Sequence, residues 1–221
     1  MTAGGVQVAQ VVMPEKGIFL VRCPSAPPPC GTRAVVALDY GPDMGLVTSG
    51  GPYDPARHGA RPPGFSLVRA KTAADDAVLA ENERLAQTMR AAFQRAARAA
   101  GLDLRVPYAR LSFARTRLFI RYAADAAPPP DLSRPVAELR RLFGVSVNAW
   151  QMGPRDEVSV LGGLGPCGRP CCCATWQTRY PAAPAAARTK GLNPASLNGT
   201  CGRAKCCLAF EDADERKEDE T

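Results

Sequence analysis

The stretch that decides the middle of the fold runs from Ser66 to Gly101 and reads SLVRAKTAADDAVLAENERLAQTMRAAFQRAARAAG. Residues 66–70 can form a short strand, and residues 72–75 have the form of a capping box that opens a helix. Apolar residues then recur at helical spacing up to Gly101, a residue type that commonly ends helices. We therefore predict a strand followed by one long helix. Its apolar stripe comprises Val78, Leu85, Met89, Phe93 and Ala96.

Two alternating segments, residues 105–113 and 117–123, follow this helix and are joined tightly enough to form a hairpin. A shorter helix is predicted over residues 132–143, with Gly144 as its cap, and residues 145–152 return as a strand. The order strand, helix, strand, strand, helix, strand is that of a ferredoxin-like unit, in which two helices back an antiparallel sheet. We predict this unit over residues 65–153.

Four short strands are predicted upstream, over residues 6–13, 17–22, 33–40 and 45–49. They fit a small antiparallel barrel or sheet, and a loop rich in Gly, Pro and Arg follows at residues 50–64. The sequence therefore predicts an α+β protein with a small β unit over residues 1–64 and the ferredoxin-like unit after it. A cysteine-rich segment over residues 154–210 and an acidic tail over residues 211–221 complete the chain.

Composition restricts the class of protein. The chain has 221 residues, of which 46% are hydrophobic and 22% charged, and these values are typical of a folded domain. No apolar run is long enough to span a bilayer, and the N-terminus lacks a secretory signal, so a cytoplasmic location is expected. The net charge of +7 conceals an asymmetry, because residues 211–221 hold seven acidic and two basic residues. The remainder has 26 basic and 14 acidic residues, a charge of +12 that suits phosphate or an acidic protein surface.

Seven of the nine cysteines lie between Cys167 and Cys207. Residues 165–173 read GPCGRPCCC and residues 199–207 read GTCGRAKCC, so the pattern C-G-R-x-x-C-C occurs twice with an offset of 34 residues. In a reducing compartment such clustering indicates metal ligation or thiol chemistry rather than structural disulfides. Thiolates are soft ligands for iron–sulfur clusters and for zinc. The single histidine, His58, excludes zinc fingers that need two histidines.

Each half of the repeat offers several thiols, and neighbouring cysteines rarely point at one ion. Arg169 and Arg203 place positive charge next to the sulfurs, where it lowers thiol pKa and offsets an anionic cluster. A knuckle held by structural zinc and a set of buried free thiols are the alternatives. A four-thiolate site would use Cys167, one of Cys172 and Cys173, Cys201, and one of Cys206 and Cys207.

The repeat and its surroundings resemble the RicT (YaaT-like) family. The similarity rests on the run LGGLGPCGR at residues 161–169, on Trp176, on residues 192–194 and on residues 201–211. Residues 155–157 and 48–50 are also similar to the family's pattern. It implies a bacterial cytoplasmic regulatory subunit that forms an iron–sulfur complex, of the 4Fe–4S type, with two small helical partner subunits of the Ric complex. The complex would act with ribonuclease Y in messenger RNA processing. The cysteines that match the family motifs are Cys167, Cys172, Cys173, Cys201, Cys206 and Cys207, whereas Cys171 departs from the pattern.

A second candidate surface lies on the predicted hairpin. Arg117, Phe119 and Arg121 share one face of a strand, and an aromatic ring between arginines suits base stacking with phosphate contact. A solvated or partner-covered sheet face is the favoured interpretation, because the aromatic ribonucleoprotein motif is missing. No catalytic set of residues is recognisable, so we expect a regulatory or scaffold protein and not an enzyme. The alternative is a direct RNA- or DNA-binding protein whose cysteines hold structural zinc.

Overall fold

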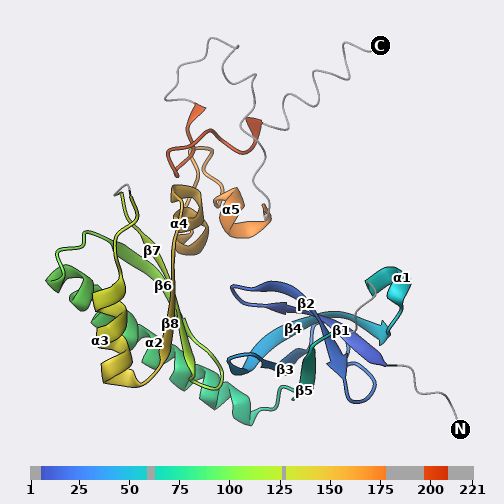
Figure 1. Cartoon of the computed structure of the whole chain (residues 1–221). Helices are drawn as coiled ribbons and strands as arrows, with labels where there is room; N and C mark the ends of the chain where they lie inside the picture. The colour runs from blue at the N-terminus through green and yellow to red at the C-terminus, as the bar shows by residue number, and fades with distance from the viewer. Residues whose placement is uncertain (1–5, 59–62, 126–127, 178–196, 209–221) are drawn as a thin grey trace, which may run out of the picture. The chain divides into compact units, whose positions relative to one another are not determined.

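The computed structural model describes residues 6–58, 63–125, 128–177 and 197–208 (Figure 1). The chain forms two compact units. The first contains residues 1–101, 109–120 and 132–149, and the second contains residues 102–108, 121–131 and 150–221. Strands and helices are combined along the chain, which confirms the predicted α+β class. Residues 192–194 and the acidic stretch 211–221, which carry sequence predictions, lie outside the described residues.

A closed five-stranded barrel forms the N-terminal part of the first unit, with its strands adjacent in the order β1-β2-β5-β3-β4. Alternate side chains of the strands fill its interior, where Val11, Val21 and Val36 are fully buried. The first four strands match predicted segments, although β4 is longer and includes the start of the predicted loop at residues 50–64. The bounds are β1 Gln7–Met13, β2 Gly17–Cys23, β3 Arg33–Leu38, β4 Gly41–Pro52 and β5 Phe65–Ala70.

The strand β5 is where the fold departs from the predicted ferredoxin-like unit. Residue Phe65 pairs in parallel with Val21 of β2, and Leu67 pairs with Val36 of β3. This pairing gives β2 and β3 a neighbour on their open sides and closes the barrel, which removes exposed sheet edges. The ferredoxin-like arrangement is therefore not confirmed, because its expected first strand belongs to the barrel. The predicted boundary at residue 64 falls within the barrel's run of strands.

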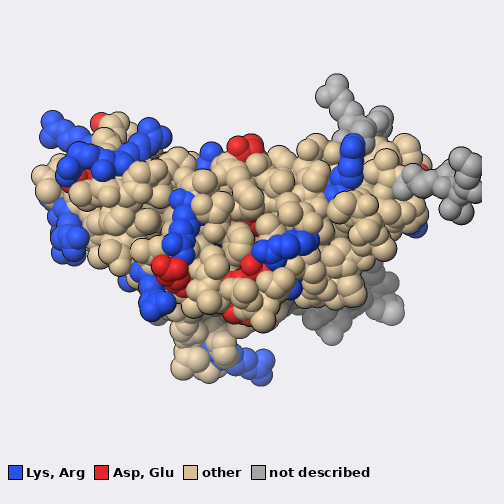
Figure 2. Space-filling view, turned by 90° about the horizontal axis from the view of Figure 1, so that it is seen from below, with Lys and Arg blue, Asp and Glu red and all other residues tan. Residues whose placement is uncertain are grey.

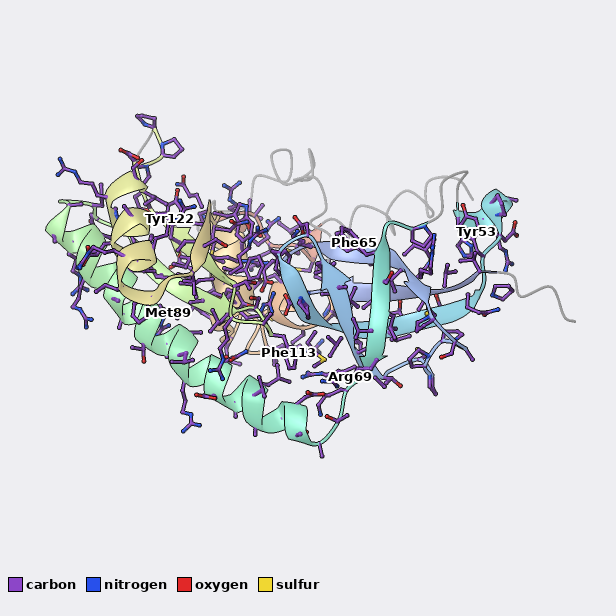
Figure 3. All side chains as sticks on the ribbon, turned by 60° about the horizontal axis from the view of Figure 1, so that its bottom comes forward. Tyr53, Phe65, Arg69, Met89, Phe113 and Tyr122 are labelled. Carbon is purple, nitrogen blue, oxygen red and sulfur yellow. The ribbon has the colours of Figure 1, made fainter. Side chains whose placement is uncertain are left out.

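A three-stranded sheet, in the order β6-β7-β8, follows β5 and the long helix. Figure 1 shows α2 and α3 side by side on one side of this sheet. Both helices match their predictions, and Met89 and Phe93 of the predicted stripe are buried. Figure 3 labels Met89 on α2. Gly144 ends the second helix with a φ of +66°, as its predicted role as a cap requires. The bounds are α2 Ala74–Ala99, β6 Arg105–Leu111, β7 Arg117–Ala123, α3 Ser133–Phe143 and β8 Ser146–Gln151.

An ion pair fixes the passage from β5 into α2. Arg69, which Figure 3 labels, donates to the Asp75 carboxylate through Nη1 at 2.6 Å and through Nη2 at 2.8 Å. The Thr72 backbone N–H donates to the same carboxylate at 2.7 Å, which is half of the predicted capping box. The hydrogen bond from Arg69 contributes most, and together with the Thr72 N–H it holds the pKa of the Asp75 carboxyl well below its usual range. The helix therefore begins at a residue whose charge is already neutralised.

Three short helices were not predicted. They are α1 Pro55–His58, α4 Pro154–Leu161 and α5 Cys172–Thr175. The α4 segment carries signals that reasoning from apolar periodicity overlooked, since Pro154 stands at its first position and Asp156 and Glu157 in its first turn. Within the described residues, every helix is too short or too polar to cross a membrane.

Candidate metal centre

The two copies of the cysteine repeat fold into two loops with the same backbone hydrogen bonds. In the first loop Gly165 N–H donates to Arg169 C=O at 2.8 Å, and in the second Gly199 N–H donates to Arg203 C=O at 2.8 Å. The closing bonds also correspond, because Cys171 N–H donates to Gly163 C=O at 3.0 Å and Lys205 N–H donates to Leu197 C=O at 2.8 Å. All of these pairs are related by the 34-residue offset of the sequence. The repeat is therefore structural as well as sequential.

One glycine in each loop enables the turn that follows the first cysteine. Gly168 has a φ of +75° and Gly202 a φ of +70°, in the left-handed region that residues with a Cβ adopt only at a cost. No atom lies within 4 Å of a Cβ built at either position. The glycines of C-G-R are thus explained by backbone conformation and not by crowding.

Replacing Gly202 by alanine is expected to strain the second loop by about 1–2 kcal/mol, because only the backbone conformation opposes the change. Hydrogen–deuterium exchange of the amides in residues 199–207 should become roughly 5- to 30-fold faster. Gly199→Ala is the matched control, since its added Cβ would meet only ordinary contacts, at 3.6 Å from Arg203 O and 3.8 Å from Cys201 Sγ. Equal exchange in the two variants would contradict the conformational role of Gly202.

The loops bring all seven clustered cysteines to the wall of one cavity of about 90 Å³ in the second unit. Cys171 is buried, whereas Cys167 and Cys207 are exposed. The remaining four are half-buried, so none of the seven sits deep in the protein away from the cavity. The six cysteines of the predicted site therefore lie together, and Cys171 lies with them. The thiols that line the cavity are Cys167, Cys171, Cys172, Cys173, Cys201, Cys206 and Cys207.

Thiols of the two loops influence one another across this cavity. Burial raises the pKa of the Cys173 thiol, and the thiols of Cys171, Cys201 and Cys206 raise it further. Burial likewise raises the pKa of the Cys206 thiol, against the opposing charge of Arg155. Cys206 belongs to the second loop and yet senses Cys172 of the first. Each loop therefore lies within electrostatic reach of the other's sulfurs.

Comparison with known proteins shows one family profile and one curated protein that are similar to parts of this chain. A family profile described as "PSP1-like protein, third domain" matches residues 185–217, which include the second loop. The "Stage 0 sporulation protein YaaT" of Bacillus subtilis (strain 168) is 31% identical over 114 residues. The chain resembles the YaaT-like family, as its cysteine repeat predicted. The alignment covers 50% of this chain and 41% of that relative, so the chain spans less than half of the relative's length. No solved structure matches.

The thiols at this cavity have the chemistry to bind a metal group, although the structure does not gather them around one point. Among the residues that the structure describes, no group of three or more His, Cys, Asp or Glu side chains is close enough to hold one ion. Seven soft donors nevertheless share one cavity wall, with the basic residues Arg155 and Lys205 beside them. Both loops face this one cavity. The donor set therefore fits an iron–sulfur cluster or zinc.

The basic residues at the cavity differ from those that the sequence singled out. Arg155 of α4 lines the cavity and donates from Nη2 to the Ala204 carbonyl at 3.0 Å, which holds the second loop against the helix. Arg169 and Arg203 are exposed and do not line the cavity, although their carbonyls close the two loops. Their predicted influence on the sulfurs stays a prediction. Arg155 belongs to a run that resembles the family pattern, but its place at the cavity was not predicted, because the unpredicted helix α4 positions it.

Two further contacts hold the centre in place within the second unit. Thr200 Oγ1 donates to the Leu164 carbonyl at 3.0 Å, which links the second loop directly to the first. Arg105 Nε of β6 donates to Glu157 Oε1 of α4 at 3.0 Å. The cysteine loops are thus connected through α4 to a strand of the sheet, so a change at the loops can be felt at β6.

The predicted nucleic-acid contact on β7 needs a correction. Phe119 is fully buried, with the Tyr40 ring centroid at 5.5 Å and the Arg110 guanidinium at 4.7 Å from its ring. A fully buried ring has no accessible face for a base, so stacking on Phe119 is wrong. Arg117 lies over the Tyr40 ring at 4.6 Å, and Arg121 over the Tyr108 ring at 5.5 Å. Strand alternation identified the shared face of these residues but not what covers it.

Proposed function

We propose that this chain is a cytoplasmic, non-enzymatic subunit that binds an iron–sulfur cluster and serves as a regulator or scaffold. In this proposal it acts with the small helical partner subunits of the Ric complex and modulates messenger RNA processing by ribonuclease Y. The family resemblance implies these partners, and the match to a YaaT protein supports the resemblance. The one structural observation that carries the proposal is the single cavity lined by seven cysteines from two like-folded loops.

Both loops would contribute to the cluster in this proposal. Cys167 and Cys201 occupy equivalent loop positions, and each loop adds one thiol from its adjacent pair, Cys172 and Cys173 or Cys206 and Cys207. A bound cluster would supply a redox- and oxygen-sensitive crosslink between the loops. The chain's own residues supply the frame: Thr200 joins the loops, and Arg155 holds the second loop to α4. The basic side chains of Arg155 and Lys205 at the cavity would offset the negative charge of thiolates.

Zinc is the second candidate, and the tight glycine turns of the two loops favour it. A structural zinc site uses four thiolates in tetrahedral geometry, which two such loops can provide. With zinc the segment would be a stable knuckle, and the protein would then be a direct RNA- or DNA-binding protein. The two candidates differ in oxygen sensitivity and in the need for inorganic sulfide, and both properties can be measured.

Protein purified without oxygen, alone and together with its partner subunits, is expected to contain iron and acid-labile sulfide. Its visible absorption should show broad sulfide-to-iron bands that bleach when dithionite is added, because cluster iron is reduced. Metal analysis and a sulfide assay on the same sample provide the measurement. Stoichiometric zinc with neither iron nor sulfide in the assembled complex would replace the cluster by the zinc knuckle.

A further inference from the structure

A row of two aromatic side chains and one arginine crosses the β6-β7-β8 sheet. Ser146 N–H of β8 donates to the Thr116 carbonyl at 3.0 Å, and Met152 N–H donates to the Tyr122 carbonyl at 2.7 Å. Both bonds join residues 30 apart in sequence, so β7 and β8 are parallel along their whole length. In parallel pairing each donor lies beside the residue after its acceptor, which places Trp150 directly beside Arg121. Arg117 Nε meets Ser146 Oγ at 3.4 Å, as this register requires.

The neighbouring strand extends the row. Ser112 N–H of β6 donates to the Arg117 carbonyl at 2.8 Å in the tight hairpin, and antiparallel pairing from there sets Tyr108 opposite Arg121. The Arg121 guanidinium indeed lies over the Tyr108 ring at 5.5 Å from its centroid. Tyr108, Arg121 and Trp150 therefore stand side by side on one face of three adjacent strands, and all three belong to the second unit.

This row is accessible where the row next to it is not. Trp150 is 41% exposed, and Tyr108 and Arg121 are half-buried. Phe119, one step along β7 on the same face, is fully buried. On the opposite face Leu118 and Ile120 are fully buried in the core. Trp150 lies near the end of the edge strand β8, and a large indole with this exposure on a sheet face offers apolar area to another molecule.

We propose that the row of Tyr108, Arg121 and Trp150 binds single-stranded nucleic acid, with a base stacked on the Trp150 indole and the adjacent phosphate near Arg121. Aromatic side chains on a sheet stack bases of any sequence, and a neighbouring guanidinium adds charge to the contact. The charge of +12 on the chain without residues 211–221 suits a phosphate backbone, and the indole beside a guanidinium matches a base beside its phosphate. Figure 2 shows Lys and Arg side chains on one face in separate groups, not in one continuous patch. The aromatic row would therefore fix where the nucleic acid binds, which the scattered basic residues alone do not.

The first test uses tryptophan fluorescence, since Trp150 and Trp176 are the two tryptophans of the chain. In the Trp176→Phe protein the emission comes from Trp150 alone. Titration with single-stranded oligouridylate of about 12 nucleotides, a length that spans one such site, should quench this emission. A duplex RNA and a single-stranded DNA of the same length are the comparison probes. The proposal requires quenching by at least one single strand that exceeds quenching by the duplex, and its absence for both strands overturns the stacking site.

The second test separates stacking from general attraction to a basic surface. Trp150→Ala should weaken binding of the oligouridylate about 5- to 150-fold at both low and moderate salt, the range for one lost stack. Trp176→Ala, which removes a more exposed indole at 61% exposure, should leave the affinity unchanged. Trp150→Phe should restore most of the binding, because an aromatic ring can still stack, and circular dichroism of Trp150→Ala checks that this variant is folded. Arg121→Ala should lower affinity more than Arg98→Ala on α2, although each removes one charge.

Equal binding by Trp150→Ala and Trp176→Ala at every salt concentration overturns the proposal, and Trp150 would then belong to a contact with protein. The site is independent of the proposed cluster. Iron and sulfide content should be the same in the Trp150 variants as in the unaltered protein, so failure of one proposal is recognisable without failure of the other.

Discussion

Replacing Cys201 by serine is expected to remove as much bound iron as replacing Cys167. The two residues occupy equivalent positions in loops whose thiols line one cavity, and the second loop has only three thiols of its own. A shared site that loses one ligand loses its cluster, so each single variant and the double variant should all be nearly empty. Iron and acid-labile sulfide per chain, measured after anaerobic purification, provide the readout. Cys30→Ser is the matched control, because Cys30 is an exposed free cysteine outside the cavity.

The same series distinguishes one shared site from two. If each single variant keeps half of the iron and only the double variant is empty, the loops hold independent groups. Cys171→Ser adds a second comparison, because the 34-residue offset aligns Cys171 with Lys205, which has no thiol. A ligand set drawn equally from both loops does without Cys171, so this variant should retain its iron. Loss of iron in Cys171→Ser would show that the first loop contributes more ligands than the second.

Local patterns were sufficient for much of the fold. The helix α2 begins and ends close to its capping and glycine signals, and the segments that alternate between polar and apolar residues all became strands. These features depend on neighbours in sequence, which is why one chain suffices to read them. The strands that pair with β5 could not be predicted from such local patterns. A strand followed by a helix fits either a ferredoxin-like sheet or a barrel, and the choice depends on Val21 and Val36, far away in the sequence.

The candidate sites show the same limit. The cysteine repeat predicted that its thiols would be used together, because identical sequences take up identical turns, as Gly168 and Gly202 do. It could not identify Arg155, which reaches the cavity from a helix that precedes the repeat. On β7 the alternation placed Phe119 between two arginines correctly. The contact with Tyr40 of the barrel, which covers that ring, leaves no trace in the spacing of β7 itself.

Arg110→Ala is expected to destabilise the protein by about 3–5 kcal/mol near neutral pH, because it leaves buried charge without compensation. Arg110 Nη2 of β6 donates to Glu15 Oε2 at 2.6 Å and to Asp43 Oδ2 at 2.9 Å. The side chains of both carboxylates are almost wholly buried, at 2% and 0% exposure. Urea unfolding at about pH 7 gives the loss as a change in free energy. Arg141→Ala removes an exposed pair with Glu138 and should leave the free energy of unfolding nearly unchanged.

The pH dependence of this loss tests its cause. Burial alone would raise the pKa of the Asp43 carboxyl, but the Arg110 hydrogen bonds and charge, with donors from Phe113 N–H and Tyr40 Oη, outweigh it and lower the pKa. A lowered pKa stabilises the folded state above the unfolded pKa of an aspartate, and this contribution fades as the pH falls through the folded value. Without Arg110 burial prevails and the pKa rises, so Asp43 takes up a proton on folding under mildly acidic conditions. The deficit of Arg110→Ala should therefore shrink between about pH 7 and pH 4.5, whereas a deficit that stays constant over this range would assign the loss to packing of the Arg110 stem against Phe119.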